Sequence, residues 1–347
     1  MKAWVLENVG DISLQDIEVP KPGENEVLIN VMAAGICGSD IPRIYETGAH
    51  RMPLVPGHEF SGVVDAAGGD AGKSFIGKRV GVFPKIPCGK CAYCQKGRGD
   101  LCNQYDYVGS RRDGAFAEYV TAPFANLIEL PDNVTFDEAA MLEPMSVSVN
   151  AVRTGIKTAG DAATTESAIC VCGLGTIGLM ITMILKGLGY DNLYVVGNKD
   201  FQREKAALLG VSKDRFCDRR IDAPDSWLKE KSHGIDIYFE CVGSNESINY
   251  GLRAAVPAGT VIIVGNPRSD MYFDRNTYWE IPRKQLTVKG IWNSVFRDDW
   301  EYALKLIAGG NVRLLDLVTH RLPISELDKG FLIMWDKTED YCKILMS

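Results

Sequence analysis

The sequence predicts an α/β protein in which a doubly wound parallel-sheet domain is inserted between the two parts of a mostly β domain. Residues 1 to about 145 contain short strand-like runs separated by Gly and Pro turn signals. From residue 168 onward, near-continuous apolar strands alternate with amphipathic helices, which is typical of a parallel sheet covered on both faces. With 347 residues, the chain is long enough for two domains that each bury a core.

In the first part, the strand-like runs are short and irregularly spaced: 26–35, 60–68, 78–83 and 126–130. A change of character follows at Thr135, where TFDE has the pattern of a capping box completed by Glu138. This pattern predicts a helix that continues through AAMLEPMSVSVNAV, with Pro144 as a kink or break.

In the second part, four strand segments are expected at 168–172, 192–197, 236–241 and 260–264. LTVKGIWNS, from residue 286, is predicted to hold the last strand of the parallel sheet. EYALKLIAGG and SELDKGFLIMW follow it and predict two closing helices.

Composition and charge limit the classes of function. The chain is 46% hydrophobic and 24% charged and has a net charge of −7, as expected for a globular enzyme with no nucleic-acid or anionic-membrane partner. Neither a signal-peptide-like run nor a membrane-span-like apolar stretch is found in the sequence, so we expect a cytoplasmic protein. In that compartment the ten cysteines should be reduced thiols.

A glycine-rich turn follows the first strand of the second part. Gly173, Gly175 and Gly178, with Thr176 and Ile177 between them, form a GxGxxG motif that opens a helix. The first glycine permits a tight turn, the second lets the backbone approach a pyrophosphate, and the third lets helix and strand pack closely. In this strand-turn-helix context the motif predicts a Rossmann dinucleotide-binding domain.

A second constellation lies in the β domain. Cys37, His58, Glu59 and Glu143 offer thiolate, imidazole and carboxylate, the ligand types of a catalytic zinc with an open position. For any one of these residues alone, the interpretation as a buried thiol, a core histidine or a surface acid would be favoured. Beside a nicotinamide-binding domain the zinc interpretation is favoured, because removal of hydride from an alcohol needs a group that stabilises the alkoxide.

Four cysteines, at positions 88, 91, 94 and 102, lie in one short loop. Such a cluster forms a disulfide knot, a zinc cage or an iron-sulfur site. A reducing compartment disfavours the knot, and the Cys-Pro ending of the ferredoxin motif is missing. The spacing C-x2-C-x2-C-x7-C fits a structural zinc with four thiolates.

The order of these motifs resembles that of the zinc-dependent medium-chain dehydrogenases, in their polyol dehydrogenase branch. The resemblance rests on Cys37, GHE at 57–59, the cysteine loop, EP at 143–144 and GLGTIG at 173–178. It implies a GroES-like catalytic domain at 1–147 with a structural-zinc lobe at about 86–104. It further implies a Rossmann domain at 148–287, a return segment at 288–347 that completes both, and two zinc ions per subunit.

The resemblance also assigns roles to individual residues. Cys37 and His58 would ligate the catalytic zinc, while Glu59 and Glu143 would be alternating or water-mediated ligands. If all three anionic ligands bound Zn²⁺ at once, the shell would carry one net negative charge, so we expect Glu59 to bind only when the substrate leaves. Ser39 stands where the family places a hydroxyl that passes the alcohol proton outward.

The expected reaction is the interconversion of a secondary alcohol of a polyol or polyol phosphate with the corresponding ketone. The alternatives are a non-phosphorylated, sorbitol- or iditol-type polyol dehydrogenase that uses NAD and, from another class, a non-catalytic dinucleotide-binding protein. Whether the substrate carries a phosphate depends on four arginines, which either grip it bidentately or pin their own loops: Arg43, Arg51, Arg111 and Arg112.

The end of the second Rossmann strand indicates which nicotinamide is used. NAD enzymes present Asp or Glu there, whereas this chain has Gly197, Asn198 and Lys199, which resemble the pattern of NADP-dependent relatives. Asp200 is the competing interpretation, but it should lie beyond the strand and cap the next helix. We therefore expect NADP(H) to be preferred and NAD(H) to remain possible. The other expected dinucleotide-binding residues end two later strands: Cys241, Val264 and Gly265.

The oligomeric state is expected from the family alone. In relatives the last Rossmann strand commonly pairs across a dimer axis, and here that strand lies within LTVKGIWNS. The resemblance therefore implies a homodimer or homotetramer.

Overall fold

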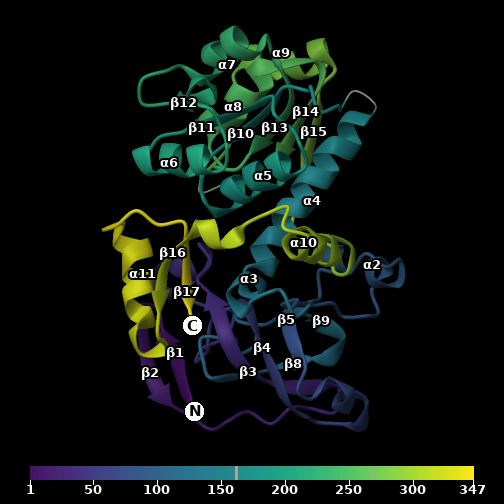
Figure 1. The fold of residues 1–347 in the computed structure, drawn as a ribbon, viewed down its shortest axis with the longest axis vertical. Coiled ribbons are helices and arrows are strands. Elements are labelled where there is room, and N and C mark those ends of the chain that lie inside the picture. Colours follow the sequence, from purple (N-terminus) through teal and green to yellow (C-terminus); the bar gives the residue numbers. More distant parts are fainter. Residues whose placement is uncertain (161–162, 268) are drawn as a thin grey trace. The chain divides into compact units, whose positions relative to one another are not determined.

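The chain forms two compact units. The computed structural model describes residues 1–160, 163–267 and 269–347. The first unit comprises Met1–Ser146 and Ser294–Ser347, and the second comprises Val147–Asn293 (Figure 1). The α/β class, with a mostly β domain and a doubly wound parallel-sheet domain, is confirmed.

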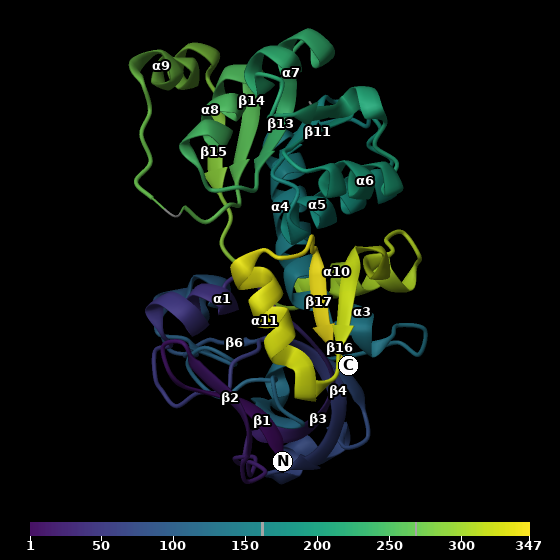
Figure 2. The same ribbon diagram turned by 90° about the vertical axis from the view of Figure 1, so that its left-hand side faces the viewer.

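A seven-stranded sheet is the framework of the first unit. Its order is β16-β17-β3-β4-β5-β9, and β8 pairs with β3 off this path. The strands are β3 (Glu26–Gly35), β4 (Glu59–Ala67), β5 (Arg79–Val82), β8 (Tyr119–Pro123), β9 (Leu127–Glu129), β16 (Val318–Leu322) and β17 (Lys343–Met346). Strands β16 and β17 come from the end of the chain, so the C-terminal segment completes a sheet begun by the N-terminal one (Figure 2).

Two small ribbons and several helices complete the first unit. The ribbons are β1 (Lys2–Asn8) with β2 (Asp11–Asp16), and β6 (Lys85–Ile86) with β7 (Asp106–Tyr107). The helices are α1 (Asp40–Pro42), α2 (Ala92–Gln95), α3 (Phe136–Ala140), α10 (Asp298–Ala308) and α11 (Leu327–Asp336). Helix α11 covers the core through Phe331, whose ring contacts those of Trp4 and Phe116 at centroid distances of 5.9 and 5.4 Å.

The predicted helix after Thr135 is divided in two. Thr135 caps α3 in the predicted capping box with Glu138, but α3 ends at Ala140 and a new helix, α4 (Leu142–Ala159), begins two residues later. A proline ring clashes with the carbonyl four residues before it, which for Pro144 is that of Ala140. The break therefore precedes the proline, and Pro144 lies in the first turn of α4, where proline is tolerated.

The second unit is a doubly wound domain. Its six strands are all parallel, in the order β12-β11-β10-β13-β14-β15. They are β10 (Ile169–Cys172), β11 (Leu193–Gly197), β12 (Phe216–Asp218), β13 (Ile235–Glu240), β14 (Ala255–Ile263) and β15 (Thr287–Gly290). Most of α4 also lies in this unit, and its other helices are α5 (Thr176–Gly187), α6 (Asp200–Leu208), α7 (Pro224–Ser232), α8 (Asn245–Ala254) and α9 (Arg275–Lys284).

The winding direction reverses beside β10, the first strand of this sheet. Successive strands extend from β10 through β11 to β12 on one side and from β13 to β15 on the other. In such sheets, ligands bind outside the carboxyl ends of the strands at this switch point. Among the helices in the described part of the chain, none has the length and apolar character needed to span a membrane.

Candidate metal centres and dinucleotide site

Three of the predicted catalytic-metal residues meet at the edge of the first unit's sheet. The ligand atoms of Cys37, His58 and Glu59 all lie within 4.8 Å of one another. Cys37 follows the end of β3 and Glu59 begins β4, and these antiparallel strands pair Gly35 with Glu59. His58 and Glu59 are 4% and 1% exposed, so a metal here would be held in a largely dry site.

The chemistry of this cluster fits a zinc ion. Thiolate sulfur, imidazole nitrogen and carboxylate oxygen are the donors that catalytic zinc sites use. Nδ1 of His58 is buried and makes no regular hydrogen bond within the described residues, although it lies 3.3 Å from Oδ1 of Asp40. A carboxylate at this nitrogen is typical of metal-ligating histidines and would leave Nε2 as the ligating atom.

Asp40 organises the charges around His58. It is fully buried, accepts a hydrogen bond from the backbone N–H of Cys37 at 3.0 Å, and pairs with Nη1 of Arg43 at 2.5 Å. Burial lowers the pKa of His58, but the Asp40 carboxylate and the Cys37 thiolate outweigh it and raise the pKa to about 10. Burial by itself would raise the pKa of the Cys37 thiol. His58 more than offsets this effect, so the pKa of Cys37 is lowered. The cluster thus favours a Cys37 thiolate beside a positively charged His58. A metal cation can supply that positive charge instead.

Glu143 lies near this cluster but outside the group of three. It is in the first turn of α4, and its Oε1 accepts a hydrogen bond from the Tyr107 hydroxyl at 3.3 Å. The Tyr107 ring packs edge-on against His58, with centroids 5.8 Å apart. Burial raises the pKa of Glu143, although His58 and Tyr107 act in the opposite direction. Ser39 is exposed, and its hydroxyl donates to Sγ of Cys37 at 3.3 Å.

Three contributors to the site were not identified from the sequence. Asp40 lies three residues after Cys37, and this position was the available signal. Tyr107 and Lys343 carry no local motif. Lys343 nevertheless forms a buried ion pair with Glu59 from the far end of the chain.

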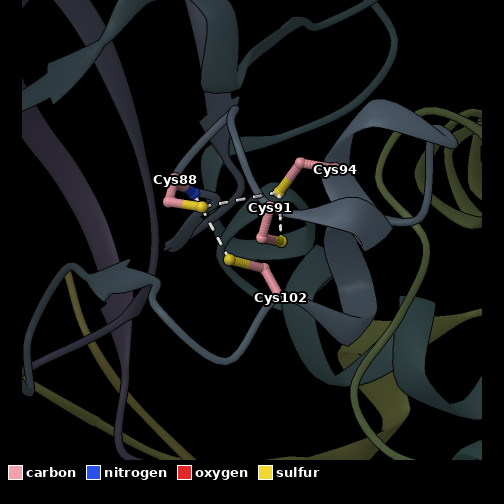
Figure 3. A group of neighbouring side chains, drawn as sticks. All are labelled: Cys88, Cys91, Cys94 and Cys102. Carbon is pink, nitrogen blue, oxygen red and sulfur yellow. Dashed lines mark hydrogen bonds between the residues drawn. The ribbon is translucent and has the colours of Figure 1, made fainter.

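The four loop cysteines are gathered as a second centre (Figure 3). Their sulfur atoms lie within 4.8 Å of one another, and no disulfide links them. Sγ of Cys94 is 3.5 Å from that of Cys91 and 4.0 Å from that of Cys88. A tetrahedral zinc with bonds of about 2.3 Å places its sulfurs roughly 3.8 Å apart. The spacing fits one ion, whereas an iron-sulfur cluster must accommodate several irons between its thiolates.

The pKa values of the loop cysteines differ, so some of them form thiolates more readily than others. Backbone N–H groups, that of Lys90 foremost, lower the pKa of Cys88 to about 6. Burial and the neighbouring cysteines raise the pKa of Cys94 to about 12. A bound cation would remove this difference, because thiolate is the ligating form of every cysteine in the cluster.

The glycine-rich turn of the second unit has the backbone geometry expected of a GxGxxG motif. Gly173 has φ of +95°, which strongly favours glycine. A Cβ on Gly178 would lie 1.8 Å from the carbonyl oxygen of Gly173, so helix α5 approaches the turn as closely as the motif demands. A Cβ on Gly175 would meet nothing within 4 Å, which leaves open space at the N-terminus of α5. Thr176 and Ile177 form the first turn of that helix.

The other expected dinucleotide residues lie at neighbouring strand ends. Cys241 donates its N–H to the carbonyl of Cys172 at 2.8 Å, which places it beside the end of β10. Val264 and Gly265 both donate to the carbonyl of Glu240, at 2.8 and 2.9 Å. All three residues therefore lie at the carboxyl edge of the sheet, where the switch point predicts a ligand.

Asp200, the alternative candidate for a carboxylate that binds the ribose, already pairs with an arginine. Strand β11 ends at Gly197, and Lys199 precedes helix α6 as its N-cap residue. Asp200 accepts a hydrogen bond from Arg220 at 2.7 Å. Asp218 is also bound by Arg220, which lowers the pKa of this carboxyl to about 2.

Arg219 was not identified from the sequence. Its N–H donates to the carbonyl of Gly197 at 2.9 Å, and its exposed guanidinium makes no ion pair within the described residues.

The four candidate phosphate-binding arginines do not form one cluster. Arg43 pairs with Asp40 beside the metal ligands, Arg51 with Asp113 at 2.9 Å, and Arg112 with Glu26 at 2.6 Å. The guanidinium of Arg111 lies 4.5 Å from the ring centre of Tyr105. Arg51, Arg111 and Arg112 line a cavity of about 300 Å³ whose described lining contains none of the candidate catalytic-metal ligands.

The fold and the two metal-ligand clusters define a class of protein, a metal-binding dehydrogenase built from a β domain and a dinucleotide-binding domain. Comparison with protein families agrees: residues 23–132 match the alcohol dehydrogenase GroES-like domain and residues 176–309 match the zinc-binding dehydrogenase domain. The chain belongs to this family of zinc-dependent, NAD(P)-dependent alcohol and polyol dehydrogenases.

Similar proteins with different substrates are found. Galactitol 1-phosphate 5-dehydrogenase of Escherichia coli K12 is 31% identical over 330 residues, which is 92% of each chain. L-threonine 3-dehydrogenase of Bacillus licheniformis is 31% identical over 327 residues, 93% of this chain and 92% of that one.

Solved structures that resemble this chain carry different cofactors. A zinc-binding dehydrogenase of Sinorhizobium meliloti bound to NADP matches with a TM-score of 0.88 and 27% identity, covering 99% and 98% of the two chains. An alcohol dehydrogenase of Escherichia coli CFT073 complexed with NADH matches with a TM-score of 0.91 and 26% identity, covering 100% and 99%.

Asp40→Asn should weaken metal binding at the first cluster. The substitution keeps the size of the side chain but removes the carboxylate that faces Nδ1 of His58, and such partners typically contribute about 10- to 100-fold to metal affinity. Competition of the zinc-loaded protein with a chelator should show this loss at one site, while the four-cysteine centre keeps its affinity. Asp70→Asn, at an exposed carboxylate, is the control. Unchanged zinc affinity in Asp40→Asn would show that Asp40 does not orient a metal ligand.

Proposed function

We propose that this enzyme interconverts a secondary alcohol of a polyol or polyol phosphate with the corresponding ketone, preferentially with NADP(H). The observation that carries the proposal is the gathering of Cys37, His58 and Glu59 in the GroES-like unit of a chain that also has the GxGxxG turn. The similarity to galactitol 1-phosphate 5-dehydrogenase supports a polyol-type substrate.

The residues would act as follows. Cys37 and His58 hold the catalytic zinc, Glu59 and Glu143 bind it alternately or through water, and the four loop cysteines hold a structural zinc, giving two ions per chain. When bound, the zinc supplies Lewis acidity that stabilises an alkoxide, and the nicotinamide supplies the hydride acceptor. Ser39 passes the proton of the alcohol outward, which its exposure and its contact with the Cys37 sulfur support.

The proposal also covers the residues that bind the dinucleotide and the compartment in which the protein acts. Gly173, Gly175, Thr176, Ile177 and Gly178 bind the pyrophosphate, and the remaining dinucleotide contacts come from Gly197, Asn198, Lys199, Cys241, Val264 and Gly265. Arg219 adds a second cation beside Gly197. Because four ligand thiolates need a reducing compartment, we also propose that the protein acts in the cytoplasm.

One observation favours a non-phosphorylated polyol as the second candidate substrate. Three of the four candidate arginines already pair with carboxylates, as described above, and the fourth stacks on Tyr105. At Arg43, Arg51 and Arg112 a phosphate would have to compete with these carboxylates.

The first test compares a hexitol with its 1-phosphate as substrates of the zinc-loaded enzyme. If Arg43 or another arginine grips phosphate, kcat/KM should be higher for the phosphate by about tenfold or more, since a hydrogen bond to a charged group contributes about 1.5–3 kcal/mol. Equal values would exclude a phosphate site and leave the polyol alone as substrate.

Cys37→Ser should abolish turnover with both substrates. Wild-type turnover without metal loss in that variant would refute the zinc mechanism.

The second test concerns the cofactor. Lys199→Ala should raise KM for NADP(H) by about tenfold or more while changing KM for NAD(H) little, because only NADP carries the 2′-phosphate that the ammonium would bind. Steady-state kinetics with both cofactors measure this, with Lys213→Ala, at an exposed lysine of the same unit, as the control. A wild-type enzyme that prefers NAD(H) would overturn the NADP assignment.

We further propose a homodimer or homotetramer formed through β15. This strand is the edge of the six-stranded sheet and all four of its residues are exposed, so its outer N–H and C=O groups can pair with a second copy. Light scattering at micromolar concentration should show at least twice the chain mass, and a strictly monomeric species would contradict the proposal.

A further inference from the structure

Lys343 is a lysine buried against the catalytic cluster. It is the first residue of β17, and its side chain is only 2% exposed. Its ammonium forms an ion pair with Oε2 of Glu59 and donates a hydrogen bond to the carbonyl of Ile36 at 3.1 Å. Lysine is almost never fully buried unless it is paired, because removing an ammonium from water is costly. The partner that compensates for this cost is a residue of the metal cluster.

The sheet itself builds this ion pair. Strand β3 lies between β4 and β17, and its last residue, Gly35, is opposite Glu59 in one neighbour and Leu345 in the other. A Cβ on Gly35 would lie 2.6 Å from Oε2 of Glu59 and 2.6 Å from Cε of Lys343. The missing side chain of Gly35 therefore provides the space in which the two charged groups meet. The hydrogen bond from the N–H of Ile36 to the carbonyl of Ile344, at 3.0 Å, fixes the strands at this point.

The ion pair with Lys343 limits how the Glu59 carboxylate can bind a metal. The position of its carboxylate makes it one of the three gathered ligands, yet one of its oxygens is held by an ammonium. With Cys37, Glu59 and Glu143 ionised around Zn²⁺ the site would carry one negative charge, and Lys343 brings the total to zero. Balanced charge matters here because an uncompensated buried charge is strongly destabilising.

We propose that Lys343 is a positioning residue of the metal centre, which holds Glu59 at the edge of the coordination shell and so keeps a coordination position open. This inference rests on the proposed function, in which Cys37 and His58 hold the metal. Without Lys343, Glu59 is free to bind the metal permanently, which strengthens metal retention and blocks the position that the substrate needs.

The test follows the metal itself with Co²⁺ as the probe, bound to the full-length protein in place of zinc. The visible absorption of Co²⁺ reports its coordination, and the difference between wild type and Cys37→Ser isolates the catalytic site from the four-cysteine site. Lys343→Met should change this spectrum toward higher coordination and slow the release of Co²⁺ to a chelator by about tenfold, while kcat/KM falls. Lys329→Met, at an exposed lysine of the return segment, is the matched control.

Two further variants keep the inference falsifiable if Lys343→Met folds poorly. Glu59→Gln alone leaves the Lys343 ammonium buried without its carboxylate, so this variant serves only as the reference for the double variant. The double variant Glu59→Gln/Lys343→Met has no unpaired charge, and its spectrum and release rate should stay near those of wild type.

Failure of the inference differs from failure of the proposed function. A Cys37-dependent spectrum that Lys343→Met leaves unchanged, or a double variant that keeps the altered spectrum and slow release of Lys343→Met, would overturn the role of Lys343 alone. A spectrum that does not depend on Cys37 would overturn the metal assignment, and with it this role of Lys343.

Discussion

The pairing of β3 with β4 and β17 is the constraint on which the catalytic site depends. Backbone hydrogen bonds at the end of β3 bring together segments that are more than 280 residues apart, the distance in sequence from Glu59 to Lys343. Cys37 follows directly from β3, and His58 and Glu59 lie where β4 begins. A one-residue slip in this register would turn Glu59 to the other face of the sheet and leave Lys343 buried without a partner.

Charge balance links the site to its surroundings. Asp40 connects the backbone of Cys37 with Arg43 and faces His58, while Tyr107 donates to Glu143 and packs on His58. His58, Glu59 and Glu143 thus each have a partner from another segment. In a dry site such partners decide which groups stay ionised and which atoms remain for a metal, because an unpaired buried charge is expensive.

The sequence was informative wherever chemistry is encoded by spacing. The glycine-rich turn, the cysteine loop and the Thr135 capping box were predicted because their members lie within a few residues of one another and their geometry is local. Cys37, His58 and Glu59 were predicted from ligand type and from resemblance to a family, and the fold gathers them. Lys343 and Arg219 could not be found in this way, because each depends on which strands become neighbours, and a lone cation carries no motif.

The proposed function requires one chain to hold two zinc ions, one catalytic and one structural. The most direct test is elemental analysis of the purified, chelator-washed protein against an accurate protein concentration. We expect about two zinc ions per chain, one for each cluster of donors. A stoichiometry of one or none in active, folded protein would contradict it.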